Sequence, residues 1–377
     1  MTQVVERADE RVDERTDLHV APPSRLPVLG WPVPAALGAP RMRELLRVLA
    51  GMAGAILLFA VVLLLQGKNP LIAYKDMLHT TLGSSYGFSE VLVQMIPLLL
   101  CALAVSVPAR VGLVNVGGEG QLYVGGLFAA WAALNLDGLS RPLLLLVMLL
   151  LAMAGGAIWA GIAAVLRALN WLNEAICTLL LNYVAILVIQ YFVQGPWRAK
   201  GAAAGNYPQS ALFAKAAWLP TWHSTRVHLG LVIGLIAVAI FAFVLRRTRW
   251  GFEMRAIGGN PEASRRLGLP ISRYIMIALM VGGAIAGLAG LGEVAGTQHR
   301  LRKDISAGYG YVGFLISWLA GHSPIGIVAM SFLLAVITAG GDSLQINQHL
   351  PGSSVNLLIA LTLFMVLAQR GRKGQRA

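Results

Sequence analysis

The chain has 377 residues, of which 57% are hydrophobic and 12% are charged, and its formal net charge is +13. A soluble globular domain carries roughly twice that share of charged residues, so the composition excludes an ordinary soluble protein. In a soluble protein the basic excess would favour nucleic-acid binding. Here the basic residues lie beside apolar runs, so membrane topology explains them better and no nucleic-acid partner is expected.

The two ends of the chain differ from its body. Residues 6–17 repeat one acidic and basic four-residue pattern three times, and residues 22–40 contain six prolines. A segment with so little to bury is expected to stay disordered. We therefore predict a disordered charged and Pro-rich cytoplasmic tail at residues 1–40, a transmembrane domain at 41–370 and a basic cytoplasmic tail at 371–377.

Uncharged apolar runs recur throughout residues 41–370. A membrane span needs about 20 such residues at a rise of 1.5 Å each. The run at 305–341 is too long for one helix and is interrupted at 321–324, so it predicts two spans. Eight further runs predict one span each: 48–66, 91–109, 120–136, 142–166, 175–197, 227–245, 274–292 and 343–369. The expected fold is all-α, a polytopic transmembrane helical bundle of about ten spans with one short helix outside the membrane.

The basic residues orient these spans. Arg110, Arg167, the basic segment 246–273 and the C-terminal tail fall on one side if the spans alternate. The positive-inside rule then places both termini in the cytoplasm. We expect the protein to lie in the cell (inner) membrane. Basic residues within 198–226 and 300–303 fall on the extracytoplasmic side, against the rule. The rule applies best to short loops, so a longer loop outside can carry these charges.

Residues 111–121 would enter the membrane from the cytoplasmic side, and they hold Asn115, Glu119 and Gln121 among four glycines. So many glycines and a carboxylate disfavour a continuous helix. Irregular backbone at that depth must be buried in protein or line a watery cavity. One interpretation places these polar residues on a translocation pathway, and the other makes the segment a structural kink with Glu119 paired to a basic residue.

A second polar group begins the span at 175–197. Asn173 and Glu174 precede Thr178 and Asn182, and the spacing of four puts the last three side chains on one helix face. Polar residues in a span face the protein interior or a pore rather than lipid. This face therefore predicts either hydrogen bonds between helices or a wall of the pathway.

The basic segment 246–273 contains its own helix start. Asn260 is a cap-type residue, Pro261 suits the first helical position and Glu262 suits the first turn. Gly268 and Pro270 would end the helix after about two turns. A short, separately capped helix outside the membrane predicts a contact surface for a soluble partner.

Motifs of enzymes are absent from the sequence. There is no Gly-x-x-x-x-Gly-Lys-Ser/Thr, His-Glu-x-x-His, Cys-x-x-Cys or Gly-x-Ser-x-Gly. The seven histidines lack metal-ligand spacing, and Cys101 and Cys177 both lie in apolar spans. We expect no catalysis, no cofactor and no metal.

Four segments in order resemble one family, the ABC-importer permeases for ribose and other simple sugars, branched-chain amino acids and nucleosides. They are ARVGLVNVGGEGQLYVGGL at 109–127, NEAICTLLLNYVA at 173–185, RAIGGNPEASRRLG at 255–268 and GYGYVGFLISWLAGHSPIG at 308–326. The chain is most similar to the nucleoside or simple-sugar permeases.

The resemblance implies partners: an ABC ATPase, an extracytoplasmic substrate-binding protein and a second permease chain, a shorter paralogue. It also implies that the short helix is a coupling helix that fits a groove of the ATPase. The residues that match this element are Gly258, Gly259, Asn260, Pro261, Glu262, Ala263, Arg265, Arg266, Leu267 and Gly268. Arg265 and Arg266 could meet acidic residues of the ATPase, or could only follow the cytoplasmic charge bias.

The expected function is ATP-driven import of a small neutral solute, a nucleoside, nucleobase or simple sugar, by alternating access. Residues expected near the pathway are Asn115, Glu119, Gln121, Asn173, Glu174, Thr178 and Asn182. A secondary transporter is the alternative, and it would need ion-coupling carboxylates at mid-membrane. The candidates for that role are Glu119, Glu174, Glu293 and Asp342, most of which lie near span ends. A membrane scaffold would not need the capped helix.

Overall fold

The computed structural model describes residues 39–371 apart from 201–206 and 223–224. The predicted tails at 1–40 and 371–377 therefore lie outside the described residues, except for Ala39, Pro40 and Gly371. The chain divides into two units, Met1–Arg47 and Val48–Ala377. Of the first unit only residues 39–47 are described, and they are helical.

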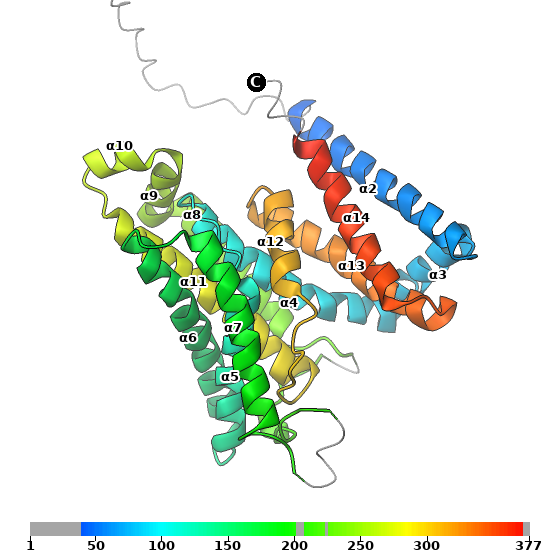
Figure 1. Ribbon diagram of the computed structural model, residues 1–377, viewed down its shortest axis with the longest axis horizontal. Helices are drawn as coiled ribbons and strands as arrows, with labels where there is room; N and C mark the ends of the chain where they lie inside the picture. The colour runs from blue at the N-terminus through cyan, green and yellow to red at the C-terminus, as the bar shows by residue number, and fades with distance from the viewer. Residues whose placement is uncertain (1–38, 201–206, 223–224, 372–377) are drawn as a thin grey trace, which may run out of the picture. The chain divides into compact units, whose positions relative to one another are not determined.

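The described part of the chain is built from helices, with isolated β-bridges and no strand ladder (Figure 1). This confirms the predicted all-α class. In chain order the elements are α2 (Ala39–Leu65), α3 (Pro70–Leu82), α4 (Ser85–Ala109), α5 (Gly118–Asn135), α6 (Arg141–Ala168), α7 (Glu174–Gln194), the short 3-10 helix η2 (Lys215–Ala217), α8 (Gly230–Arg247), α9 (Arg249–Gly259), α10 (Pro261–Arg266), α11 (Ile271–Leu291), the π-helix η3 (Gly292–Thr297), α12 (Tyr309–Leu319), α13 (Pro324–Gln348) and α14 (Gly352–Gly371).

Each of the ten predicted spans coincides with a helix, from α2 to α14, leaving out α3, α9, α10 and the short η elements. Six of the described helices are long and apolar enough to cross a membrane, and α2 with α3, bent by 118°, would make a seventh. A polytopic helical bundle is therefore confirmed, whereas the number of ten spans stays a prediction.

One predicted boundary is wrong. The uncharged runs end on either side of Asp342, which suggested a break between two spans at that residue. Instead α13 continues through Asp342 to Gln348, and the break falls at residues 349–351. Asp342 is tolerated inside the helix because its carboxylate accepts hydrogen bonds from amide side chains of Gln94 and Gln345.

Local chemistry explains most helix starts. Side chains of Asn69, Ser84, Asn173, Thr248, Asn260 and Ser323 each accept a hydrogen bond from a first-turn backbone N–H. Such a cap satisfies a donor that has no partner inside the helix. Proline occupies one of the first two positions of α3, α6, α10 and α13, where its missing N–H costs nothing.

Glycine permits close contact between α6 and α11. A Cβ placed on Gly156 would overlap the carbonyl oxygen of Gly283, and one on Gly287 would overlap that of Ala152. Small residues at such crossings let two helix backbones approach closely. Close packing stabilises helix contacts in a bilayer, because there is no hydrophobic driving force between helices in lipid. These two helices, with α5, form one half of the bundle's core.

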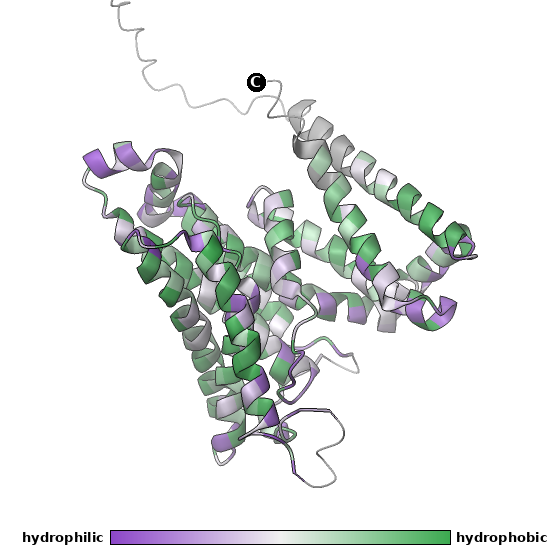
Figure 2. Cartoon of the chain, in the orientation of Figure 1, coloured by the Kyte–Doolittle hydropathy of each residue, from purple (hydrophilic) through white to green (hydrophobic). Residues whose placement is uncertain are grey.

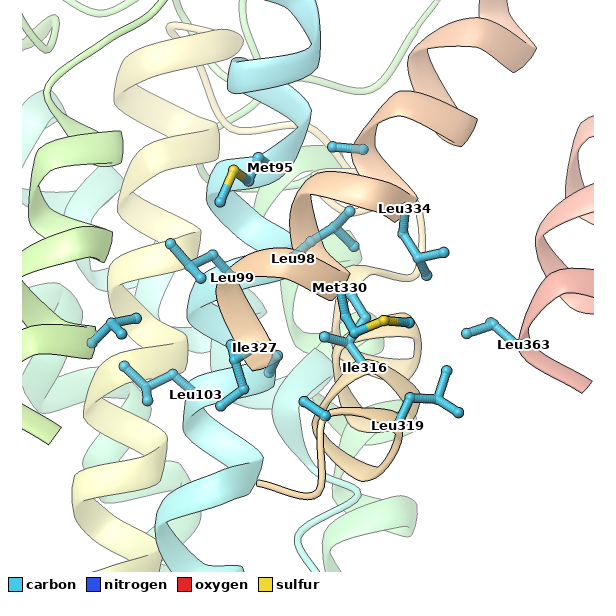
Figure 3. Packing of buried hydrophobic residues seen from close by; sticks show 14 of the residues in the cluster. Met95, Leu98, Leu99, Leu103, Ile316, Leu319, Ile327, Met330, Leu334 and Leu363 are labelled. Atoms are coloured by element: carbon cyan, nitrogen blue, oxygen red, sulfur yellow. The ribbon is translucent and has the colours of Figure 1, made fainter. Parts of the chain in front are cut away.

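The second half of the core surrounds α4. Figure 3 shows its side chains Leu98, Leu99 and Leu103 beside Ile316 of α12 and Ile327 of α13, all of them buried. Hydrophilic residues gather on α9 and α10 at one end and on the loops at the other (Figure 2). The apolar helices between these ends are the membrane-spanning part of the molecule.

Candidate functional site

The loop that joins α4 to α5 is held against α7 by the polar face predicted from its spacing. Glu174 Oε1 accepts from Val114 N at 3.3 Å, and Thr178 Oγ1 accepts from Val116 N at 3.2 Å. Asn182 accepts from Gly120 N at 2.8 Å and donates to the Val116 carbonyl oxygen at 2.9 Å. The α7 side chains thus satisfy the irregular backbone at 114–116 and a first-turn N–H of α5, groups that lack a partner within a helix.

Asn115 of this loop and Gln121 in the first turn of α5 form a reciprocal amide pair. Asn115 Nδ2 donates to Gln121 Oε1 at 3.1 Å, and Gln121 Nε2 donates back to Asn115 Oδ1 at 3.0 Å. Asn115 Oδ1 also accepts from Gly117 N at 3.0 Å. The pair closes the turn that leads into α5.

Glu119 connects the start of α5 to the start of α12. Its Oε2 accepts from Gly310 N at 2.7 Å, across 191 positions of sequence. A carboxylate is stabilised at a helix N-terminus by the unpaired N–H groups and the helix dipole. The backbones touch here, because a Cβ on Gly310 would overlap the Glu119 nitrogen. Two helix N-termini therefore meet at this carboxylate.

The kink interpretation paired Glu119 with a basic residue, and the ion pairs of the described residues do not include one at Glu119. Arg167 instead lies 2.8 Å from Glu174. The helix start of α12 takes the place of the expected cation at Glu119. The kink itself is present, because residues 110–117 are not helical.

We call this set of buried contacts the polar junction: Asn115, Glu119, Gln121, Glu174, Thr178 and Asn182. Their exposed fractions run from 0% to 6%. The polar atoms are directed at one another and at the backbone, which matches the interpretation of hydrogen bonding between helices. Asn173 is separate from the junction, since it is exposed and its side chain caps α7 through Ala175 N at 2.9 Å. That these residues lie beside a solute path stays a prediction.

The basic segment forms a hairpin of two helices, α9 and α10. The predicted cap is present: Asn260 Oδ1 accepts from Ala263 N at 3.0 Å, Pro261 begins α10, and Gly268 has a φ of +79° beyond its end. On the surface, Glu262 pairs with Arg265 at 2.9 Å and lies 3.6 Å from Arg266. These pairs lie within the helix, so they stabilise α10 and do not require a partner protein.

The sequence interpretation missed α9. Thr248 is the residue in the sequence that could have indicated this helix, because threonine is a common N-cap. Its side chain caps α9 by accepting a hydrogen bond from Gly251 N at 3.1 Å. Glu253 anchors α9 to α11 by accepting from the Tyr274 hydroxyl, and it pairs with Arg249 at 2.7 Å. Those two hydrogen bonds lower the pKa of Glu253 and keep it ionised. The hairpin is thus attached to a membrane-spanning helix.

Gly258 links the hairpin to the loop before the polar junction. A Cβ on Gly258 would collide with the Arg110 carbonyl oxygen, and it would lie 3.3 Å from Gly112 N. Gly112 has a φ of +81°, which an L side chain rarely adopts. The last turn of α9 therefore lies directly on the backbone at 110–112, a few residues before Val114 and Val116.

Comparisons with known proteins show which family the sequence belongs to. Residues 87–368 match the family described as "Branched-chain amino acid transport system / permease component". The chain is 36% identical over 333 residues to the glucose ABC transporter permease protein TsgB13 of Haloferax volcanii, covering 85% of this chain and 87% of the relative. It is 31% identical to the nucleoside ABC transporter permease protein NupB of Lactococcus lactis, covering 86% and 91%. It is also 31% identical to the guanosine ABC transporter permease protein NupP of Bacillus subtilis, covering 81% and 88%.

The chain belongs to the family of these ABC transporter permeases. It is a membrane-embedded transport subunit and not an enzyme. The polar junction and the α9–α10 hairpin lie within the matched residues.

Proposed function

We propose that this chain is the permease subunit of an ATP-driven ABC importer that carries a small neutral solute into the cell. A nucleoside, a nucleobase or a simple sugar is the proposed solute, since relatives over most of the chain's length are named for glucose, nucleosides and guanosine. The sequence has no P-loop. ATP hydrolysis is therefore assigned to a separate ATPase chain.

The observation that carries the proposal is the contact of Gly258 with the backbone at 110–112. The hairpin presents its charged outer face to a soluble partner, and Leu267 at its end is 80% exposed. The inner face of the hairpin contacts the backbone at 110–112, and Val114 and Val116 of the same loop are hydrogen-bonded to α7. A push on α10 would reach the polar junction through the short α9 and this backbone contact.

In the proposed cycle, closure of the ATPase dimer moves the hairpin, and the permease bundle tilts between outward- and inward-facing states. The polar junction keeps α5, α7 and the start of α12 together during that movement. The residues of the polar junction lie next to the solute path and support its wall. Solute binding along the path is weak and transient, because tight binding would trap the solute.

The assembly we propose contains a second permease chain, a shorter paralogue, and a substrate-binding protein outside the cell. Both termini and the hairpin face the cytoplasm of the cell (inner) membrane. The described residues of the loop at 196–229 lie at the end of the bundle opposite the hairpin (Figure 1), and they face the binding protein.

The test is the substitution Ala263→Arg, with Leu212→Arg as its matched control. Ala263 is on the exposed face of α10, and Leu212 is exposed on the loop at 196–229. We expect Ala263→Arg to leave the permease folded in the membrane but to abolish co-purification of the ATPase and substrate-stimulated ATP hydrolysis. Leu212→Arg, far from α10, should keep co-purification of the ATPase. Normal ATPase association and uptake in Ala263→Arg would contradict the coupling role of α10.

The energy source distinguishes this proposal from a secondary transporter, which would use an ion gradient in place of ATP. Uptake into proteoliposomes should require ATP on the hairpin side and should survive ionophores that collapse ion gradients. Uptake without the ATPase, driven by an ion gradient, would favour the alternative.

A further inference from the structure

The first half of α4 carries polar side chains along one face. Every residue from Met95 to Pro108 is buried, but Tyr86 is exposed and Glu90 and Gln94 are half-buried. Their spacing of four places the three side chains in a line along the helix. Gln94 is nine residues from the helix start at Ser85, which is about 14 Å along the axis.

The line continues onto α13 and α12. Gln94 Nε2 donates to Asp342 Oδ2 at 3.4 Å, and Gln94 Oε1 accepts from the Tyr309 hydroxyl at 3.2 Å. Asp342 is exposed and lies six residues, about 9 Å, from the end of α13 at Gln348. We call these five side chains the polar row: Tyr86, Glu90, Gln94, Tyr309 and Asp342.

Lipid is an unsuitable neighbour for the polar row. Both α4 and α13 are long and apolar enough to span a membrane. The exposed carboxylate of Asp342 and the amide of Gln94 lie within these helices, and burying such groups in hydrocarbon costs free energy. Polar groups in membrane spans therefore face water or protein. On α6 and α7, by comparison, apolar side chains such as Ile158 and Leu187 are exposed and suit lipid.

The polar row also connects two places already described. At its loop end, Glu90 forms a 3.0 Å ion pair with Arg226, which precedes α8. At its inner end, Tyr309 is the first residue of α12, next to Gly310, whose N–H is bound by Glu119. The polar row thus has the extramembrane loop at one end and the polar junction at the other.

We infer that the polar row is the solute-facing wall of the translocation path, and that it takes a neutral solute with neighbouring hydroxyl groups, such as a ribose or hexose ring. The carboxylate of Asp342 accepts hydrogen bonds from hydroxyls, while Gln94 and Tyr309 both donate and accept. Both carboxylate oxygens of Glu90 already accept from Arg226. Arg226 balances the charge of Glu90, so the negative charge of Asp342 is the one that repels phosphate esters and other anions. This inference rests on the proposed function for the direction of transport.

Cysteine accessibility in the assembled complex tests whether water reaches the polar row. Asp342→Cys and Gln94→Cys are treated in whole cells with a membrane-impermeant methanethiosulfonate, with the unsubstituted protein as background for Cys101 and Cys177. Leu187→Cys is the lipid-facing control. We expect both row cysteines to react at least tenfold faster than the control, because the reagent modifies thiolates in water. Rates equal to Leu187→Cys at both positions would overturn the inference, and ATP-dependent uptake by the unmodified complex would still stand.

Uptake tests the chemistry. Asp342→Ala should lower ATP-dependent uptake of guanosine or glucose about tenfold, the effect of losing one hydrogen bond to a charged group. Asp342→Asn keeps an acceptor oxygen and should stay within about threefold of wild type. If Asp342→Ala does not assemble, Gln94→Ala is measured in its place, with the same expected loss. Wild-type uptake in an assembled Asp342→Ala or Gln94→Ala complex would remove the polar row from the path.

Discussion

At the scale of single residues, Glu119 has a role that its own sequence neighbourhood does not reveal. Its carboxylate is buried and accepts the Gly310 N–H at 2.7 Å, at the N-terminus of α12. A buried carboxylate needs such a partner, because burial without one is costly. The residue therefore joins α5 to α12 in place of an ion pair.

Two substitutions separate the charge of Glu119 from its hydrogen bond. Glu119→Gln keeps an acceptor oxygen for Gly310 N, so the complex should assemble with a modest loss of thermal stability. Glu119→Leu leaves that N–H unpaired and should cost about 1–3 kcal/mol. Thermal melting of the purified complex and uptake are measured together. Equal damage from both variants would mean that the negative charge itself is required, and wild-type uptake in both would exclude a role for Glu119.

At the scale of elements, the contact between α9 and the loop at 110–117 is the narrowest part of the proposed transmission route. Gly258 and Gly259 are adjacent but differ sharply. Gly258 touches the Arg110 and Gly112 backbone, while a Cβ on Gly259 would meet nothing within 4 Å. The pair offers a substitution and its control at neighbouring positions of one helix.

Gly258→Ala should force α9 away from the loop and lower uptake while the ATPase still co-purifies. Overpacking of this kind typically costs about 1–3 kcal/mol. Gly259→Ala adds the same methyl group into open space and should behave like wild type. Stimulated ATP hydrolysis, uptake and co-purification are compared for both. If Gly258→Ala transports normally, the signal does not pass through residues 110–112.

At the scale of the whole molecule, the placement of the basic residues predicts opposite exposure for the two ends of the bundle. Cysteines are introduced at Leu212, in the loop at 196–229, and at Ala263, in α10; both positions are exposed. An impermeant reagent added outside the cell should label the first and not the second, and inverted vesicles should reverse the result. Labelling of both from outside would contradict the predicted topology.

Much of the fold could be predicted from the sequence because it depends on local physics. Apolar runs give helices wherever the backbone has no water to bond, and each predicted run coincides with one. The start of α10 follows from Asn260 and Pro261, whose effects need only the next three residues. The common face of Glu174, Thr178 and Asn182 follows from helical periodicity.

Only the tertiary structure decided which partners the polar groups have. Glu119 binds an N–H 191 positions away, Gln94 reaches Asp342 across 248, and no spacing rule relates positions so distant. For the same reason Asp342 looked like a helix boundary, although its partner on α4 lets α13 continue past it. Local sequence determined where helices begin and which faces are polar; packing in three dimensions determined which polar faces are satisfied inside the protein and which remain open.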